Sequence, residues 1–278
     1  MGKLDGKVAF ITGVARGQGR SHAVRLAQEG AHIIGIDSCA DVATVGYQMS
    51  SSEDLAETVQ QVQSLDRRII ASEVDVRDSV GVTKALDEGV REFGRLDIVV
   101  ANAGIAGFCR VEDMTDEIWD DMIAINLSGQ FRTVRPAIRH LKANPDGGAI
   151  VFISSTAGRK GMANIGHYCA AKHGLAGLTK TLAIELAENR IRVNAINPTN
   201  VNTRMIHNES IYKLFFPDRD PTTVTPEDAA PLMQALNLLP SPWVDVADIS
   251  EAILYLVSDS GRYVTGVELP VDCGSLVL

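Results

Sequence analysis

Two residues one helical turn apart, Tyr168 and Lys172, could together remove a proton from an alcohol. Side chains four positions apart share one face of a helix, so the Lys172 ammonium group would lie beside the phenol and lower its pKa from the ordinary value of about 10. A tyrosine with a lowered pKa is a usable general base near neutral pH. Ser155, thirteen positions upstream at the end of an apolar run, could hydrogen-bond the same substrate oxygen. Because Tyr-x-x-x-Lys also arises by chance, this interpretation depends on the rest of the chain.

A glycine-rich turn near the start of the chain predicts a phosphate-binding site. Gly13, Gly17 and Gly19 follow a strand-like run and precede a helical pattern. Gly13 permits a tight turn, Gly17 lets the backbone approach a pyrophosphate, and Gly19 allows close packing of helix on strand. A second strand-like run ends in Asp37, 24 positions after Gly13. An acidic residue at a separation of about 20 meets the ribose of a dinucleotide in such units.

The elements that would position these residues alternate along the chain. Strand-like and helix-like runs follow one another, which is the pattern of a parallel sheet with crossover helices. Asp78 is expected to cap the start of one helix and Gly94 to end it. A stripe of leucines on a later helix, at positions 175, 178, 182 and 186, is expected to face the core or another subunit. The expected strands are Val8–Thr12, His32–Asp37, Ile69–Asp75, Leu96–Ala101, Ala149–Ser154, Arg192–Ile196 and Val267–Val271.

Two segments interrupt this alternation. The insert, residues 39–52, is longer than the usual connection of two to six residues and is expected to lie over the adenosine end of a cofactor. The lid, residues 199–245, is rich in proline and has no clear periodicity. A loop this long in a compact domain is usually functional, so a substrate lid is expected.

Composition narrows the class of protein. The formal net charge is −9 with no basic run, so no nucleic-acid or anionic-membrane partner is expected. The apolar stretches are shorter than the roughly 18 residues needed to span a bilayer, and the N-terminal residues lead straight into a strand without a signal-peptide pattern. The four cysteines show no metal-ligand spacing and suit a reducing cytoplasm, so no metal site and a cytoplasmic location are expected.

At this point the chain resembles the classical short-chain dehydrogenases/reductases over nearly its whole length. The resemblance rests on seven motifs in family order: TGVARGQG (12–19), DV (75–76), NAG (102–104), Asn126, ISS (153–155), YCAAK (168–172) and NPTNVNT (197–203). It implies a single Rossmann-type, doubly wound domain with a seven-stranded parallel sheet flanked by helices. It also implies a homo-oligomer, a tetramer, with long helices packed between subunits. Within the family, GVARGQGRSHAVRLAQEGA and GVELPVDCGS are similar to the carveol-dehydrogenase-like branch, which is described as mycofactocin-coupled and as passing electrons to an external redox carrier.

The resemblance implies a catalytic tetrad of Asn126, Ser155, Tyr168 and Lys172. Tyr168 would be the general base, and Lys172 would tune it electrostatically and bind the nicotinamide ribose. Ser155 would position the substrate oxygen, and Asn126 would continue a proton relay through water. Ser154 is the rival of Ser155, but neighbours along a strand point to opposite faces and only Ser155 has the family spacing to Tyr168.

The expected cofactor is NAD. Arg16 stands where NADP-preferring relatives often carry a basic residue, whereas the Asp37 carboxylate can accept both ribose hydroxyls of NAD and would repel a phosphate. We give Asp37 the greater weight, because Arg16 could swing to solvent. The expected cofactor contacts are Gly13, Arg16, Gly17, Gln18, Gly19, Asp37, Ser38, Asp75, Val76, Asn102, Ala103, Gly104, Tyr168, Lys172, Pro198, Val201 and Thr203.

Three functions remain open on the sequence alone. The first is an NAD-dependent dehydrogenase of an apolar, terpene-like or alicyclic secondary alcohol, whose substrate would contact Ser155, Tyr168, Ile105, Met162 and Met205. The second is an NADPH-dependent 3-ketoacyl-type reductase, which the net charge and Asp37 disfavour. The third is a non-catalytic nucleotide-binding protein, which would be expected to lack an intact tetrad.

Overall fold

The computed structural model describes residues 2–278, and its centre is one sheet of seven parallel strands. The strand order is β3-β2-β1-β4-β5-β6-β7, so the direction of winding reverses between β1 and β4. Such a reversal opens a crevice at the carboxyl ends of the strands, where ligands of doubly wound folds bind. The strands are β1 (Val8–Thr12), β2 (His32–Asp37), β3 (Ile69–Glu73), β4 (Ile98–Ala101), β5 (Gly148–Ile153), β6 (Ile191–Pro198) and β7 (Glu268–Val271).

All seven expected strands are present; β1 and β2 have the expected bounds, and the other five have shifted ends. The expected strand ending at Asp75 stops at Glu73, because the chain turns at residues 76–77, where the Asp78 N–H donates to the Asp75 carbonyl. The strand expected to include Ser154 ends at Ile153, which leaves Ser154 and Ser155 just beyond the sheet edge. These shifts of one or two residues do not change the fold class.

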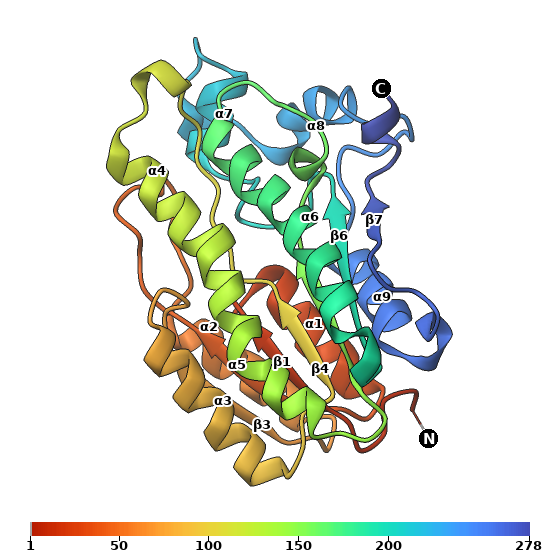
Figure 1. The fold of residues 1–278 in the computed structure, drawn as a ribbon. Coiled ribbons are helices and arrows are strands. Elements are labelled where there is room, and N and C mark those ends of the chain that lie inside the picture. The colour runs from red at the N-terminus through yellow and green to blue at the C-terminus, as the bar shows by residue number, and fades with distance from the viewer. Residues whose placement is uncertain (1) are drawn as a thin grey trace.

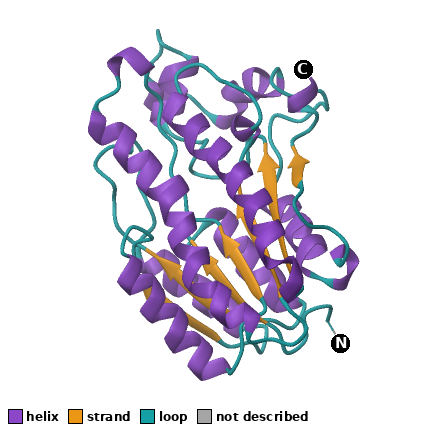
Figure 2. Cartoon of the chain, viewed as in Figure 1, coloured by secondary structure: helices purple, strands orange, loops and turns teal. Residues whose placement is uncertain are grey.

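Helices cover both faces of the sheet (Figures 1 and 2). One apolar core packs α1 (Gly17–Gln28), α2 (Ser52–Gln63) and α9 (Val246–Val257) on one face. The other core packs α3 (Ser79–Phe93), α5 (Gln130–Lys142) and α6 (Gly166–Leu186) on the opposite face. As expected, Asp78 caps α3 by accepting from the N–H groups of Val80 and Gly81, and Gly94 ends it with a φ of 81°.

The leucine stripe of α6 is mainly core within the chain. Leu175, Leu182 and Leu186 are buried in the same cluster as the inward side chains of α3 and α5, and Leu178 is partly buried against it. The outer sides of these helices carry a few exposed apolar side chains, among them Phe131 on α5 and Ile184 on α6.

The lid is more ordered than its sequence indicates. It contains α7 (Glu209–Phe215) and α8 (Pro226–Gln234), which pack on their own small core. Both helices are short, and Pro226 starts α8 behind a Thr225 capping box, so no long periodic pattern could reveal them. The lid lies above the carboxyl ends of the strands, and the C-terminus of the chain lies nearby (Figure 1).

The remaining helices are α4 and several short segments. Helix α4 (Asp116–Ile123) continues through a π-helical stretch, η2 (Ala124–Gly129), into α5. A π-helical turn inside an α-helix often marks a functional site. The 3₁₀ turns are η1 (Val111–Asp113), η3 (Thr156–Gly158), η4 (Ala187–Asn189), η5 (Pro221–Thr223), η6 (Asp259–Gly261) and η7 (Ser275–Val277).

Candidate active site

The fold brings Tyr168, Lys172 and Ser155 together at the end of β5. Lys172 Nζ lies 5.4 Å from the centroid of the Tyr168 ring on α6 and donates a 2.7 Å hydrogen bond to the Ile153 carbonyl. Ser155 lies near enough to the Tyr168 phenol to lower its pKa, and its Oγ accepts from the Ala157 N–H at 3.1 Å. Ser154 Oγ instead donates to the Lys172 carbonyl at 3.2 Å. The geometry therefore separates the two serines, and the serine at the expected spacing is the one beside the phenol.

Burial dominates the electrostatics of this cluster. It raises the pKa of Tyr168 to about 12, although the nearby Ser155 hydroxyl lowers it, and it lowers the pKa of Lys172 to about 7. The expectation that Lys172 lowers the Tyr168 pKa below its ordinary value is therefore wrong for the protein without a bound cofactor. The physical reason is that burial of the phenol itself disfavours the phenolate, and burial of Lys172, which is only 3% exposed, disfavours its charged form.

Asn126 lies in the π-helical stretch and holds the loop that follows β4. Its Oδ1 accepts from the Ile105 N–H and its Nδ2 donates to the Ile105 carbonyl, both at 2.8 Å. The amide is fully buried, and Nδ2 also contacts Met122 Sδ at 2.9 Å. Asn126 thus fixes the backbone at Ile105, and its expected place in a water relay stays a prediction.

A cavity of about 340 Å³ opens where the strand order reverses. Most of the expected cofactor contacts line it: Gly13, Arg16, Gly17, Gln18, Gly19, Asp37, Ser38, Asp75, Val76, Asn102, Ala103, Gly104 and Thr203, with Ile105 and Met205 of the expected substrate contacts. Pro198 at the end of β6, Val201 beside Val244 and the partly exposed Met162 lie outside this lining. Ser155, Tyr168 and Lys172 also lie outside it, so the roles of all six residues stay predictions.

The glycine turn forms a cradle that side chains would fill. Gly13 has a φ of 69°, and a Cβ there would lie 2.9 Å from the Ala103 Cα. A Cβ on Gly19 would lie 1.9 Å from the Gly13 carbonyl oxygen. Helix α1 begins at Gly17, so its free N–H groups face this turn. Gln18 lines the same cavity, and its buried Oε1 has no hydrogen-bond partner within residues 2–278. The cradle and this unpaired acceptor fit a phosphate-bearing dinucleotide with ribose hydroxyls.

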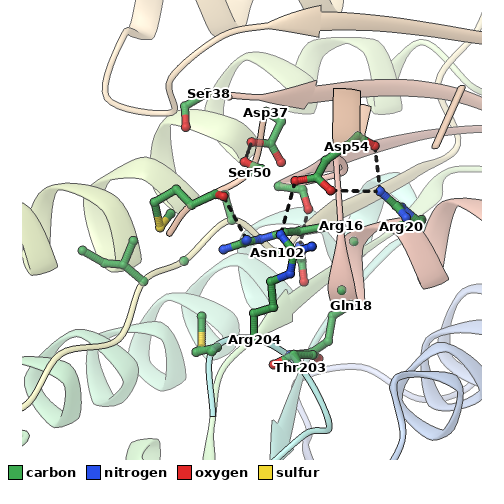
Figure 3. A pocket seen from close by; sticks show the side chains of 18 of the residues that line it. Arg16, Gln18, Arg20, Asp37, Ser38, Ser50, Asp54, Asn102, Thr203 and Arg204 are labelled. Atoms are coloured by element: carbon green, nitrogen blue, oxygen red, sulfur yellow. Dashed lines mark hydrogen bonds and ion pairs between the residues drawn. The ribbon is translucent and has the colours of Figure 1, made fainter. Parts of the chain in front are cut away.

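Asp37 is fixed in the cavity wall at the end of β2 (Figure 3). Its Oδ2 accepts from the Ala15 N–H at 2.9 Å, and its Oδ1 accepts from Ser50 Oγ at 2.5 Å and from the Cys39 N–H at 3.2 Å. A carboxylate has about four lone-pair sites, so acceptor capacity remains for a ligand hydroxyl.

Arg16 is held by the insert and is not free to swing to solvent, which corrects that part of the cofactor argument. Its guanidinium donates to the carbonyls of Gln48 at 2.7 Å and Met49 at 2.9 Å. Burial lowers the Arg16 pKa, and the neighbouring Arg204 lowers it further. To pair with a phosphate, Arg16 would have to give up two backbone hydrogen bonds.

The insert and the lid supply wall residues that sequence reasoning missed. Val42, Tyr47, Met49 and Ser50 of the insert line the cavity. Arg204 of the lid also lines the cavity, and its Nη1 lies 3.8 Å from Oδ2 of Asp54 on α2 (Figure 3). The position of the insert was a usable signal, but which of its side chains turn inward depends on long-range contacts.

The part of the chain that the structure describes contains neither a metal-ligand cluster nor a membrane-spanning helix. No group of three or more His, Cys, Asp or Glu side chains in residues 2–278 could hold a metal ion. Within the same residues, every helix is too short or too polar to cross a bilayer.

Comparison with known proteins assigns the family. The family model described as short chain dehydrogenase matches residues 7–212. A (−)-trans-carveol dehydrogenase of Rhodococcus erythropolis is 48% identical over 276 residues, with 99% of each chain covered. The crystal structure of a carveol dehydrogenase from Mycobacterium avium in complex with NAD has a TM-score of 0.97 at 52% identity and full coverage of both chains. A short chain dehydrogenase from Mycobacterium paratuberculosis bound to NAD has a TM-score of 0.91 at 40% identity, also with full coverage of both chains.

The fold, the site and these matches agree. The chain belongs to the short-chain dehydrogenase family. Within the family, it is similar to the carveol dehydrogenases over its whole described length.

Proposed function

We propose that this protein is an NAD-dependent oxidoreductase that interconverts an apolar, terpene-like or alicyclic secondary alcohol and its ketone. The observation that carries the proposal is the cluster of Tyr168, Ser155 and Lys172 beside a cradle fitted to a dinucleotide. The carveol dehydrogenases, which act on a terpene alcohol by name, support the substrate class. The Asp37 carboxylate at the end of β2 supports NAD over NADP.

The catalytic roles follow from the contacts. Ser155 holds the substrate oxygen next to Tyr168, and Tyr168, as the phenolate, takes the hydroxyl proton and becomes the neutral phenol. Before this transfer, the positive charges of Lys172, anchored on the Ile153 carbonyl, and of the bound oxidised nicotinamide would stabilise the phenolate. Bound NAD would supply the hydride acceptor for the carbinol carbon, and its oxidised ring would add positive charge to the site. Burial of Tyr168 favours the neutral phenol, so in the protein alone Tyr168 carries the proton that the reverse direction, ketone reduction, requires.

The residues that line the cavity would bind the cofactor, and the insert and the lid would cover the two ends of the site. The glycine turn receives the pyrophosphate, Asp37 accepts from the adenosine ribose, and the walls formed by Asn102–Gly104 and Thr203 border the rest of the cofactor. The insert covers the adenosine end, and the lid closes over the substrate. The support is that both segments contribute residues to the same cavity and touch each other where Ser210 Oγ donates to the Gly46 carbonyl at 2.9 Å.

The finer parts of the proposal concern assembly and electron transfer. The protein forms a homotetramer through the outer faces of α5 and α6, works in the cytoplasm, retains NAD between turnovers and passes electrons to an external carrier of the mycofactocin type. The exposed Phe131 and Ile184 support the interface. Retention is supported by the bonds of the insert to Arg16 and Ser210, because affinity differences among related complexes arise mostly in the dissociation rate.

One set of assays tests these statements. The purified protein is incubated with a panel of terpene and alicyclic alcohols, with NAD alone and with an artificial electron acceptor added. We expect turnover that depends on the alcohol and rises when the acceptor is present. A variant in which the insert is shortened to a tight turn should release NAD faster in competition with labelled cofactor. No oxidation of any alcohol and no reduction of any corresponding ketone would refute the proposed function, and rapid NAD exchange in the intact protein would refute retention.

A further inference from the structure

Tyr47, within the insert, reaches across to the loop that follows β4. Its hydroxyl accepts a hydrogen bond from the Ala106 N–H at 3.2 Å, although the two residues are 59 positions apart in the chain. The preceding residue, Ile105, is held on both its N–H and its carbonyl by Asn126. The loop that borders the active site is therefore fixed by Asn126 from inside the fold and by Tyr47 from the insert.

The Tyr47 hydroxyl still has a proton to donate. A phenol donates one hydrogen bond and also accepts, and here only the accepting side is used. Within residues 2–278, neither a carbonyl nor a side chain accepts the Tyr47 proton. Burial raises the Tyr47 pKa, against smaller lowering effects of the Ala106 N–H and Arg16, so the hydroxyl stays protonated at neutral pH. Tyr47 lines the cavity, so its unused donor is available to a ligand there.

The contents of the cavity wall indicate which ligand would accept this proton. Tyr47 lines it together with the glycine turn and with Asn102–Ile105. A small apolar alcohol carries one oxygen, and Ser155 and Tyr168 already address that atom. A dinucleotide carries phosphate and ribose oxygens along most of its length, so it offers acceptors where the alcohol has none.

We propose that Tyr47 is a cofactor-binding residue whose hydroxyl donates to a phosphate or ribose oxygen of the bound dinucleotide, while the Ala106 N–H holds that hydroxyl in place. The inference rests on the proposed NAD-dependent function. It gives the insert a direct hydrogen bond to the cofactor in addition to its contacts with the protein. It also links the cofactor, through one oxygen atom, to the backbone of the loop that Asn126 positions.

The test is a binding measurement on Tyr47→Phe, which keeps the ring and removes only the hydroxyl. NADH is titrated into the protein and its fluorescence gives the dissociation constant. We expect binding to weaken by roughly 5- to 20-fold, as for one hydrogen bond to a polar or charged acceptor. The matched control is Tyr255→Phe, which removes a hydroxyl from a half-exposed tyrosine of α9 outside the cavity lining and should leave binding unchanged.

Thermal unfolding separates a contact to the cofactor from a purely structural role. If Tyr47 donates to the dinucleotide, the rise in Tm that saturating NADH produces should be smaller in Tyr47→Phe than in the wild type. If Tyr47 only braces the Ala106 loop, the variant would melt lower without NADH and the rise would be unchanged, which would overturn the proposal. An unchanged NADH dissociation constant combined with a raised KM for the alcohol would assign the proton to the substrate and would also overturn it. Failure of the wild type to bind NADH would instead refute the proposed function.

Discussion

The two ends of the active site are held in different ways. At the catalytic end, Tyr168 and Lys172 come from one long helix and Ser155 from the adjoining strand end, so packing against the sheet fixes all three. At the adenosine end, the wall includes the insert and the lid, which are joined where Ser210 donates to Gly46. Arg16 of the glycine turn holds the insert through the carbonyl of Met49.

This difference assigns distinct tasks to the two regions. Proton transfer requires distances that hold to within a few tenths of an ångström, and a site on regular elements provides them. Cofactor binding requires a wall that can close over the dinucleotide once it has entered, and segments outside the sheet can move without disturbing the catalytic residues. Changes at the catalytic end should therefore reduce the chemical step, whereas changes at the adenosine end should alter cofactor affinity and exchange.

The largest expected effect is that of Tyr168→Phe. The substitution preserves the ring and removes the transferable proton, so turnover should fall by at least roughly 10²-fold. NADH affinity, measured by fluorescence titration, should stay nearly unchanged, because the expected loss is in the chemical step. If the variant retains most of its turnover, Tyr168 is not the general base. The proposed difference between the catalytic end and the adenosine end would then also be wrong.

Asp37→Ser tests the adenosine end. Loss of a charged acceptor should weaken NAD binding by roughly 10- to 100-fold and narrow the preference over NADP, with little effect on the rate at saturating cofactor. NADP should gain little in absolute affinity, because Arg16 is bound to the carbonyls of Gln48 and Met49. Glu73→Ser is the control, since Glu73 is paired in register with Asp37 on β3 but is exposed and lies outside the cavity lining. Equal dissociation constants for the wild type and Asp37→Ser would mean that Asp37 does not touch the ribose.

Lys172→Met tests the cost of burying a charge at the catalytic end. Burial lowers the Lys172 pKa to about 7, while a lysine in the unfolded chain titrates near about 10.4. Between these values the unfolded chain binds more protons than the folded one, so this group makes the protein more stable as the pH rises.

The comparison should therefore depend on pH. We compare the free energy of unfolding of Lys172→Met with that of the wild type by urea unfolding at two pH values. The difference, variant minus wild type, should be higher by roughly 2 kcal/mol at about pH 6.5 than at about pH 9. Lys84→Met removes an exposed lysine from α3 and should show no such trend. A stability difference that is flat with pH would show that Lys172 is not desolvated as the structure indicates.

The smallest effect is expected for Arg204→Ala in the lid. Arg204 is 60% exposed in its side chain and lies 3.8 Å from Asp54, and ion pairs of this kind contribute little to stability. NADH affinity should change by less than about threefold, with a faster dissociation rate as the more sensitive readout in stopped-flow displacement. A loss of more than tenfold would show that the lid holds the cofactor more firmly than these contacts suggest.

The spacing of the catalytic residues is visible in the sequence, whereas the inward positions of the insert and lid side chains are not, and the reason is physical. Ser155, Tyr168 and Lys172 depend on helix periodicity and strand alternation, which are local rules that the sequence shows directly. The seven strands were likewise found because apolar runs are local, with errors only at their ends. The inward positions of Tyr47, Ser50 and Arg204 depend on partners 59, 13 and 150 residues away, and no local pattern encodes them.

Three further misses also have physical causes. Arg16 was expected to be free, but its partners lie more than thirty residues away in an irregular segment. The pKa of Tyr168 was expected to fall, because the spacing to Lys172 is visible in the sequence whereas the degree of burial is not. Helices α7 and α8 were missed because each is too short to establish a period.

The most direct test of the account is a single-turnover experiment with NAD. Enzyme saturated with NAD is mixed with an apolar secondary alcohol, and the near-ultraviolet absorbance of the reduced nicotinamide is followed. The account predicts a rapid rise of up to one equivalent per site in the wild type, a rise slowed by at least roughly 10²-fold in Tyr168→Phe, and a much weaker response with NADP. A wild-type protein that forms no reduced cofactor with any alcohol of the panel and oxidises none with any ketone, or that responds only with NADP, would contradict it.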